Sequence, residues 1–318
     1  GAVYLFSTST DLQTIASSNS SSSPINAKLV ASAAGGGATF YGPNPWNVLG
    51  ASGFGSSLAL SDLNNTNSSS TLAIGASQTG GSGALYLVDT QQSFTKPQAS
   101  QPDWLSNINT FGSNQYLAHL ASSTTLYGAA SLDFFANGLV NLGDVNADGY
   151  DDLLIQAFNA SSGAGNGYVL FGSDQVMPTT TSGTPNPATG SVAPGSIGSF
   201  KRADGTSFTT AILTELGNGS SAYTGQGSFG AGDVNSDGLN DIPLGSGPNG
   251  SSYLTWGHPY LEAITNLQLS KLASNTGYLL DGLATSTQGS LRSIGDFNGD
   301  GYGDFLSINP GPFLTNVR

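Results

Sequence analysis

Short apolar runs alternate with Gly, Asn, Asp and Ser along most of the chain. The clearest runs cover residues 84–88, 153–158, 168–171, 253–256 and 305–308. Runs of this length between turn-forming residues are typical of β-strands. Helical spacing of apolar residues is rare, and it predicts only one modest helix, at 259–272. The pattern therefore predicts an all-β chain. Two stretches rich in Ser and Thr, 17–23 and 179–189, are predicted to be exposed loops.

One sequence pattern recurs along the chain, in three nearly intact copies and one weaker copy. In chain order they are FGSSLALSDLNNTNSSSTLAIGA (54–76, repeat 1), NLGDVNADGYDDLLIQAF (141–158, repeat 2), AGDVNSDGLNDIPLGS (231–246, repeat 3) and SIGDFNGDGYGDFLSIN (293–309, repeat 4). In each copy an apolar strand leads into an acidic loop and a second strand leaves it. After a variable loop, repeats 1 to 3 continue with a third strand: GALYLV, GYVLF and SYLTW. Successive loops begin 82, 89 and 63 residues apart. A unit of this size with about four short strands is typical of a β-propeller blade that carries long loops.

The loop consensus is Asp-x-Asn-x-Asp-Gly-x-x-Asp, whose oxygen atoms can converge on one cation when the chain curls around it. Calcium takes six to eight such oxygens in flexible geometry, whereas magnesium prefers to keep water in a stricter site. The loops contain no His or Cys, which argues against zinc, copper or nickel. The sequence therefore predicts about three Ca²⁺ ions per chain. The predicted ligands at positions 1, 3, 5, 7 (backbone carbonyl) and 9 are Asp144, Asn146, Asp148, Tyr150 and Asp152 in repeat 2, Asp233, Asn235, Asp237, Leu239 and Asp241 in repeat 3, and Asp296, Asn298, Asp300, Tyr302 and Asp304 in repeat 4.

These loops differ from an EF-hand, which has a glutamate at position 12 and lies between helices. Position 12 is Ile155, Leu244 or Ser307 here, and the flanking segments are predicted strands. Repeat 1 is degenerate. It keeps Asp62 and Asn64, but Thr66 stands at position 5. We expect this loop to close through side-chain hydrogen bonds without a metal, although the sequence leaves calcium binding there open.

Two of the copies carry Phe54-Gly55 with Ile74-Gly75-Ala76 and Phe229-Gly230 with Leu244-Gly245-Ser246. At these positions they resemble the FG-GAP repeat of integrin α-subunit β-propellers and their bacterial relatives. The resemblance covers about residues 54–88, 135–172, 226–257 and 289–309. It implies one calcium-binding β-propeller domain over residues 1–318, located outside the cell or on its surface. Integrins usually have seven blades, and only four repeats are recognisable here. A smaller ring, degenerate blades or a truncated chain could each account for the difference.

The two ends of the sequence complement each other. Repeat 4 has no YVLF-type strand after residue 309, whereas the N-terminal segment GAVYLF is a strand of that type. Residues 2–6 are therefore predicted either to complete the last blade or to pair with a neighbouring subunit. The N-terminus also lacks the basic region of a signal peptide, so we expect a processed form or a piece of a longer precursor.

The composition narrows the classes of partner. The chain has 7 basic and 20 acidic residues, a net charge of −13 and no cysteine. This balance argues against nucleic-acid binding and against docking on anionic lipid. Ten of the 20 acids lie in the three intact loops, and three bound Ca²⁺ would change the net charge from −13 to −7.

No catalytic motif stands out, so we predict that the chain is not an enzyme. His occurs only as His119 and His258, and neither H-E-x-x-H nor G-x-S-x-G is present. The G-x-G-x-x-G at 225–230 leads into a predicted calcium hairpin rather than a helix, so it does not have the context of a dinucleotide-binding site. Trp46 and Trp104 lie in Pro-flanked loops, where they could stack on a sugar or fill a gap between blades.

The function expected from these features is adhesion or ligand binding at a cell surface by a calcium-stabilised propeller. Its partner would be a protein or a glycan, with self-association open, no nucleic acid and no membrane insertion. One alternative is a structural subunit of a surface fibre or layer joined by strand exchange. Another is the accessory propeller of a polysaccharide-active enzyme.

Overall fold

Strands make up nearly all the regular structure in a computed structural model of the chain. The structure describes residues 2–5, 38–41, 54–65, 71–77, 81–89, 114–116, 123–128, 130–174, 176, 188–191, 200–201, 207–208, 210–214, 228–230, 232–244, 252–263, 266–269, 272, 274–280 and 290–308. Most strand pairs in these ranges are antiparallel, and helix is limited to one turn, α4 (Ala160–Gly163), and one 3-10 turn, η4 (Leu261–Ala263). Across the described ranges, no helix is long and apolar enough to cross a membrane. The all-β prediction is confirmed.

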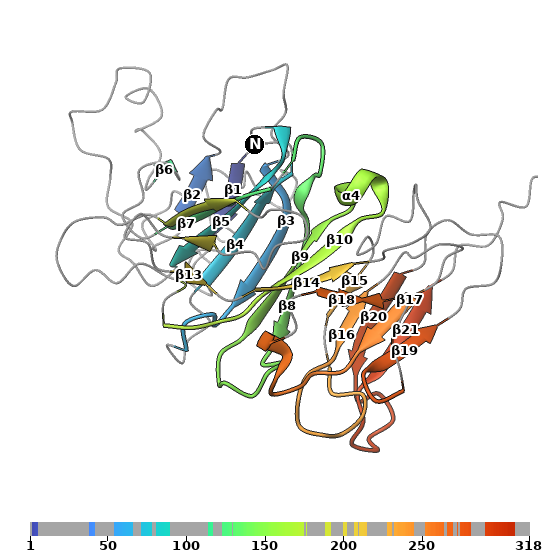
Figure 1. Ribbon diagram of the computed structural model, residues 1–318. Coiled ribbons are helices and arrows are strands. Elements are labelled where there is room, and N and C mark those ends of the chain that lie inside the picture. Colours follow the sequence, from blue (N-terminus) through green and yellow to red (C-terminus); the bar gives the residue numbers. More distant parts are fainter. Residues whose placement is uncertain are drawn as a thin grey trace, which may run out of the picture.

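Repeats 1 and 2 each form four antiparallel strands that lie side by side in sequence order (Figure 1). The strands of repeat 1 are β3 (Phe54–Ser61), β4 (Thr71–Ala76), β5 (Ala84–Asp89) and β7 (Ser123–Tyr127), and those of repeat 2 are β8 (Phe135–Gly143), β9 (Asp152–Ala157), β10 (Asn166–Leu170) and β14 (Thr210–Thr214). Repeat 3 contributes β16 (Ile242–Leu244), β17 (Ser252–Thr255) and β19 (Gly277–Leu280), and repeat 4 contributes β20 (Ser290–Gly295) and β21 (Asp304–Ile308). All five predicted strand segments fall on these elements.

Three short strands extend these sheets in a way that the sequence did not predict. β11 (Ala188–Ser191) pairs in parallel with β7, β18 (Asn266–Gln268) with β14, and β6 (Asn114–Tyr116) with β2 (Ala38–Tyr41). Each extra strand comes from the connection between the third and fourth strands of the next repeat along the chain. The predicted loop 179–189 is therefore wrong at its end, because residues 188 and 189 belong to β11. Smaller pairings join β12 (Phe200–Lys201) to β13 (Ser207–Phe208) and β15 (Ser228–Phe229) to β20.

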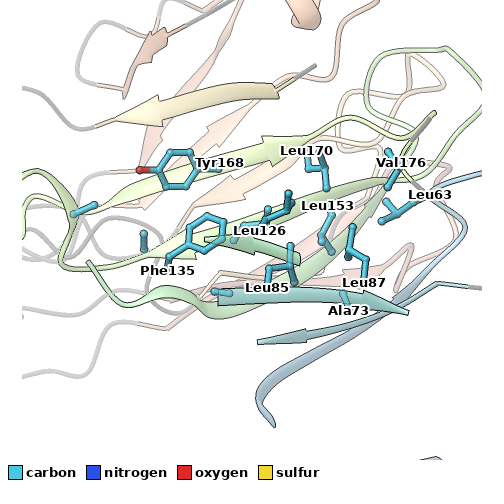
Figure 2. Packing of buried hydrophobic residues seen from close by; sticks show 14 residues of the cluster. Leu63, Ala73, Leu85, Leu87, Leu126, Phe135, Leu153, Tyr168, Leu170 and Val176 are labelled. Carbon is cyan, nitrogen blue, oxygen red and sulfur yellow. The ribbon is translucent and has the colours of Figure 1, made fainter. Parts of the chain in front are cut away.

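The sheets of repeats 1, 2 and 3 pack face to face in chain order, and the second strands of repeats 1 and 2 are buried along their whole length. In β9, Leu153 and Ile155 join a cluster shared with repeat 1, whereas Leu154 between them joins a cluster shared with repeat 3. Figure 2 shows the first cluster, in which Leu87 of β5 is directed toward Leu153. Because both faces are covered, these strands read as continuous apolar runs rather than as an alternation of apolar and polar residues.

The predicted helix at 259–272 is wrong. The structure has the 3-10 turn η4 at its start and the strand β18 in its middle. Leu261 and Leu269 still reach the buried cluster between repeats 2 and 3. The apolar spacing therefore identified residues that are buried, but these residues lie in and next to a turn and a strand rather than in a helix.

The N-terminal strand β1 (Ala2–Leu5) pairs antiparallel with β2. The sequence prediction had placed it in the last repeat or in a neighbouring subunit. In the structure, β20 pairs with β21 on one side and with β15 on the other, and β1 lies in a separate sheet with β2 and β6.

We expect Leu154→Ala to lower the free energy of unfolding by about 2–5 kcal/mol, because it empties a fully buried position between two sheets. The matched control is Leu279→Ala, at a side chain that is 51% exposed, with an expected loss below about 1 kcal/mol. Equilibrium urea unfolding of both variants measures the difference, and equal losses would contradict two-sided burial of β9.

Candidate metal centre

The three intact loops fold into the same turn, organised by the aspartate at position 1. In repeat 2, Asp144 Oδ1 accepts the N–H of Ala147 at 2.7 Å, and its Oδ2 accepts the N–H of Gly149 at 2.9 Å. The position 6 N–H bonds to the position 1 carboxylate in the other two loops as well, at 2.8 Å in each. The first carboxylate therefore curls the chain around itself without any metal.

Side chains at positions 3 and 5 tighten the same turn. Asn146 Oδ1 accepts the N–H of Asp148 at 3.2 Å, and Asp148 Oδ1 accepts the N–H of Tyr150 at 2.8 Å. The corresponding bonds are present in repeats 3 and 4, all at 2.9 Å. The glycine at position 6 has φ of +87° to +91° in all three loops, a conformation that an L side chain rarely adopts.

The aspartate at position 9 attaches each loop to the sheet. Asp152 Oδ2 accepts the N–H of Val145 at 2.9 Å, and Oδ1 accepts the N–H of Gly172, just beyond the third strand, at 2.9 Å. Asp241 makes the same two bonds in repeat 3, and Asp304 makes the first of them in repeat 4. Asp152 and Asp241 are 0% and 1% exposed. Position 9 therefore has a structural role that the sequence analysis did not foresee.

Burial raises the pKa of Asp152 to about 8 and that of Asp241 to about 6, and the nearby carboxylates of the same loop add to the rise. Hydrogen bonds from backbone N–H groups oppose it in both cases. A cation in the loop would favour the ionised form of these buried groups. In the exposed loop of repeat 4, N–H donors led by Gly301 instead lower the pKa of Asp296.

The donor set of each loop fits calcium in its chemistry. Carboxylate and amide oxygens at positions 1, 3 and 5 come from one tight turn, together with the carbonyl at position 7, and calcium prefers oxygen ligands. In the part of the chain that the structure describes, no group of three or more acidic or His side chains is arranged to hold an ion. The carboxylates at positions 1 and 5 instead accept N–H groups of their own loop. The loops thus supply the ligand types and the curled backbone.

Glu262 is a further carboxylate at the loop of repeat 2, and the sequence analysis missed it. It lies on η4, and its Oε1 accepts a hydrogen bond from Asn146 Nδ2 at 2.8 Å. The two residues are 116 positions apart, so no local spacing could reveal the pair.

The loops also join each repeat to the one before it. The N–H at position 8 donates to the carbonyl at position 1 of the preceding loop, from Asp151 to Asp62, Asn240 to Asp144 and Gly303 to Asp233, at 3.3, 3.3 and 2.6 Å. A second bond joins the end of the third strand to position 2 of the preceding loop, from Ser173 to Leu63 and from His258 to Val145. The candidate metal loops therefore lie at the joints between sheets.

The degenerate loop of repeat 1 takes part in these joints. The Asp151 carboxylate accepts the N–H of Asp62 at 2.9 Å and a bond from Asn141 Nδ2 at 3.1 Å. Asn65, at position 4, has a positive φ of 48°, as Ala147 does at the same position of repeat 2 with 65°. Thr66 lies outside the described residues, as do Trp46, Trp104 and His119.

A cavity of about 160 Å³ lies beside η4 in repeat 3, lined by Thr255, Trp256, His258, Leu261, Leu267, Asn275 and Thr276. The Trp256 indole meets Tyr278 edge-on at 5.2 Å, and its N–H donates to the carbonyl of Ser274. His258 stacks obliquely on Tyr260, whose side chain is 72% exposed. The cavity lining thus includes two aromatic rings, those of Trp256 and His258, and the sequence did not single it out.

Neither a scan against protein-family models nor a search of curated protein sequences finds a match to this chain.

We expect Gly257→Ala to lower the free energy of unfolding by about 1–3 kcal/mol, because the new Cβ would collide with the Asn240 carbonyl and lie 3.1 Å from the Val145 carbonyl. Gly232→Ala is the control, since its Cβ would approach only the movable Ser293 hydroxyl, at 2.9 Å. Thermal unfolding in EDTA compares the two variants, and an equal loss of stability would contradict close packing of the third strand on the loops.

Proposed function

We propose that the chain is a calcium-stabilised β-propeller of the FG-GAP type that binds a protein or glycan ligand at a cell surface. The observation that carries the calcium part is the threefold recurrence of one oxygen-rich turn with the same backbone bonds and the same left-handed glycine. The propeller part is supported by two four-stranded antiparallel meanders that stack in chain order. Sites of this kind with affinities in the micromolar to millimolar range suit the calcium concentration outside cells.

Calcium would act mainly as a structural ion. Asp144, Asn146 and Asp148 would hold it in repeat 2 together with the carbonyl of Tyr150, and the equivalent residues would do so in repeats 3 and 4. Bound ions would neutralise carboxylates that otherwise repel one another. Because the same loops donate and accept the bonds between repeats, ion binding would also stiffen the joints.

We expect millimolar calcium to raise the unfolding temperature relative to EDTA, and calorimetric titration to give about three ions per chain. A single site at a hundredfold excess of calcium over its dissociation constant would add about 2.7 kcal/mol of stability. Asp237→Asn should reduce the count by one ion. Asp62→Asn removes the same charge from the degenerate loop and should leave the count unchanged. A melting temperature that is the same in calcium and EDTA would refute the calcium sites.

The aromatic cavity of repeat 3 is the best-supported place for a ligand on the described surface. The Trp256 indole in its lining offers a flat apolar face with a polar edge, the features on which sugar rings stack. Its wall also carries Asn275 and Thr276, whose polar side chains can orient a hydroxylated ligand.

A labelled chain on a glycan array should therefore show a discrete set of hits. Trp256→Ala should abolish them, whereas Leu279→Ala should retain them. Hits that survive Trp256→Ala would place the ligand elsewhere, and an array without hits would turn the search to protein partners.

A further inference from the structure

The hairpin of β1 and β2 has the sequence and the register of the third and fourth strands of a repeat. β1 reads AVYL where β5 reads ALYL, and β2 ends in Thr-Phe-Tyr where β7 ends in Thr-Leu-Tyr. Tyr4 pairs with Thr39 as Tyr86 pairs with Thr125, and Ala2 pairs with Tyr41 as Ala84 pairs with Tyr127. The likeness therefore holds in both residue type and alignment.

The strand added beside β2 also corresponds to the one added beside β7. β6 adds in parallel to β2, with Tyr41 opposite Tyr116, just as β11 adds in parallel to β7, with Tyr127 opposite Ser191. In both cases the added strand comes from the connection between the third and fourth strands of the following repeat. β1 and β2 thus form the outer half of a repeat that precedes repeat 1. Within the described ranges, no strand covers the inner edge of β1.

The described strands of repeat 4 are the inner half of a repeat, which is the half that β1 and β2 lack. β20 and β21 are its first and second strands, and the described residues include no third strand beside β21. In repeats 1 and 2 the second strand is buried along its whole length. In β21, by contrast, Leu306 is 50% exposed.

One face of repeat 4 is apolar and open, and repeat 2 shows what normally covers it. Leu142, Val145 and Leu154 are fully buried against repeat 3. The residues at the same places in repeat 4 are Ile294, Phe297 and Leu306, which are 42%, 82% and 50% exposed. We call these three residues the tail face. In repeat 2 the equivalent residues share a cluster with Ile242 and Leu244 of β16 and Tyr253 of β17, so the tail face fits the inward face of a following repeat.

A matching open face lies on repeat 1. Leu58 pairs with Ile74 as Leu139 pairs with Ile155, so Leu58 and Leu139 hold equivalent places. Leu139 packs against the cluster shared with the preceding repeat, whereas Leu58 is 49% exposed and Leu60, on the same side of β3, is 50% exposed. We call Leu58 and Leu60 the head face.

We propose that the β20–β21 hairpin of one copy pairs with β1 of a second copy and completes a four-stranded sheet, with the tail face of the first copy packed on the head face of the second. Within the described residues, these two halves lie at opposite ends of the row of sheets (Figure 1), which favours a second copy over closure within one chain. Since two different surfaces meet, the contact is head-to-tail, and it produces a closed ring or an open filament according to the rotation between copies. When β21 pairs with β1 in the register that the second and third strands have in repeats 1 and 2, Tyr4 lies opposite Ser307 and Leu5 lies opposite Leu306. The contact rests on strand addition and apolar packing, and it goes beyond the proposed calcium function.

Sedimentation velocity over a wide range of protein concentration, in EDTA and in calcium, tests this assembly. The parent chain should form oligomers. Leu58→Lys, which blocks the head face, and Leu306→Lys, which blocks the tail face, should each remain monomeric. Leu279→Lys is the matched control, at a 51% exposed leucine outside both faces, and it should associate like the parent.

Mixing the two blocked variants gives the sharpest result. Each retains one intact face, so the mixture should form a 1:1 heterodimer that grows no further. A parent chain that stays monomeric at all concentrations, or a mixture that forms no heterodimer, would overturn the proposal. Neither result would bear on the calcium count, so failure here is distinguishable from failure of the proposed function.

A disulfide test examines the alignment directly, since the chain has no cysteine of its own. Under mild oxidation, Tyr4→Cys mixed with Ser307→Cys should give a covalent heterodimer. Tyr260→Cys, exposed and distant from both halves, mixed with Ser307→Cys should give none. A chain that carries both Tyr4→Cys and Ser307→Cys tests the alternative of closure within one chain. If this chain forms an internal cross-link at high dilution, and the mixture of the two single variants forms no heterodimer, the intermolecular contact is overturned.

Discussion

Burial of the second strand of repeats 1 to 3 along its whole length is the constraint on which the rest of the structure depends. Leu153, Leu154 and Ile155 are all fully buried, although neighbouring side chains of a strand point to opposite faces of its sheet. Such a strand is stable only when another sheet covers each side. A single repeat therefore cannot satisfy its own core, and stacking in an array follows from the sequence of that one strand.

The acidic loops solve a second problem, which is how to join stacked sheets without leaving polar backbone groups unpaired. The intact loops turn their side-chain oxygens toward their own N–H groups. The loops of repeats 1 and 2 offer the carbonyls at positions 1 and 2 to the next repeat, and the loop of repeat 3 offers the one at position 1. The buried aspartate at position 9 connects the loop to both neighbouring strands. A single short consensus thus encodes a turn, an anchor and a joint, and the same oxygen atoms supply the ligand types that calcium prefers.

The sequence predicted the parts of this structure that local patterns specify. Runs such as LLI at 153–155 and YVLF at 168–171 identify strands because they are short, apolar and bounded by turn residues. The loop consensus also brought Asp144 and Asp148 into one turn, as found. The edge strands were not predictable, because Asn114–Tyr116 and Ala188–Ser191 have no apolar run and are specified by the open edge that they cover. Glu262 meets Asn146 only through the packing of repeat 3 on repeat 2, which no linear spacing encodes.

All the backbone–backbone loop bonds between repeats run in one direction, with the donor N–H in the later repeat and the acceptor carbonyl in the earlier one. A chain leaving the ribosome therefore presents the backbone acceptors of each joint before their N–H donors are made. Each new repeat can dock on a surface that is already folded, without waiting for distant sequence. The bonds donated from position 8 join residues 70 to 96 positions apart, so each repeat docks on its immediate predecessor rather than on a remote part of the chain.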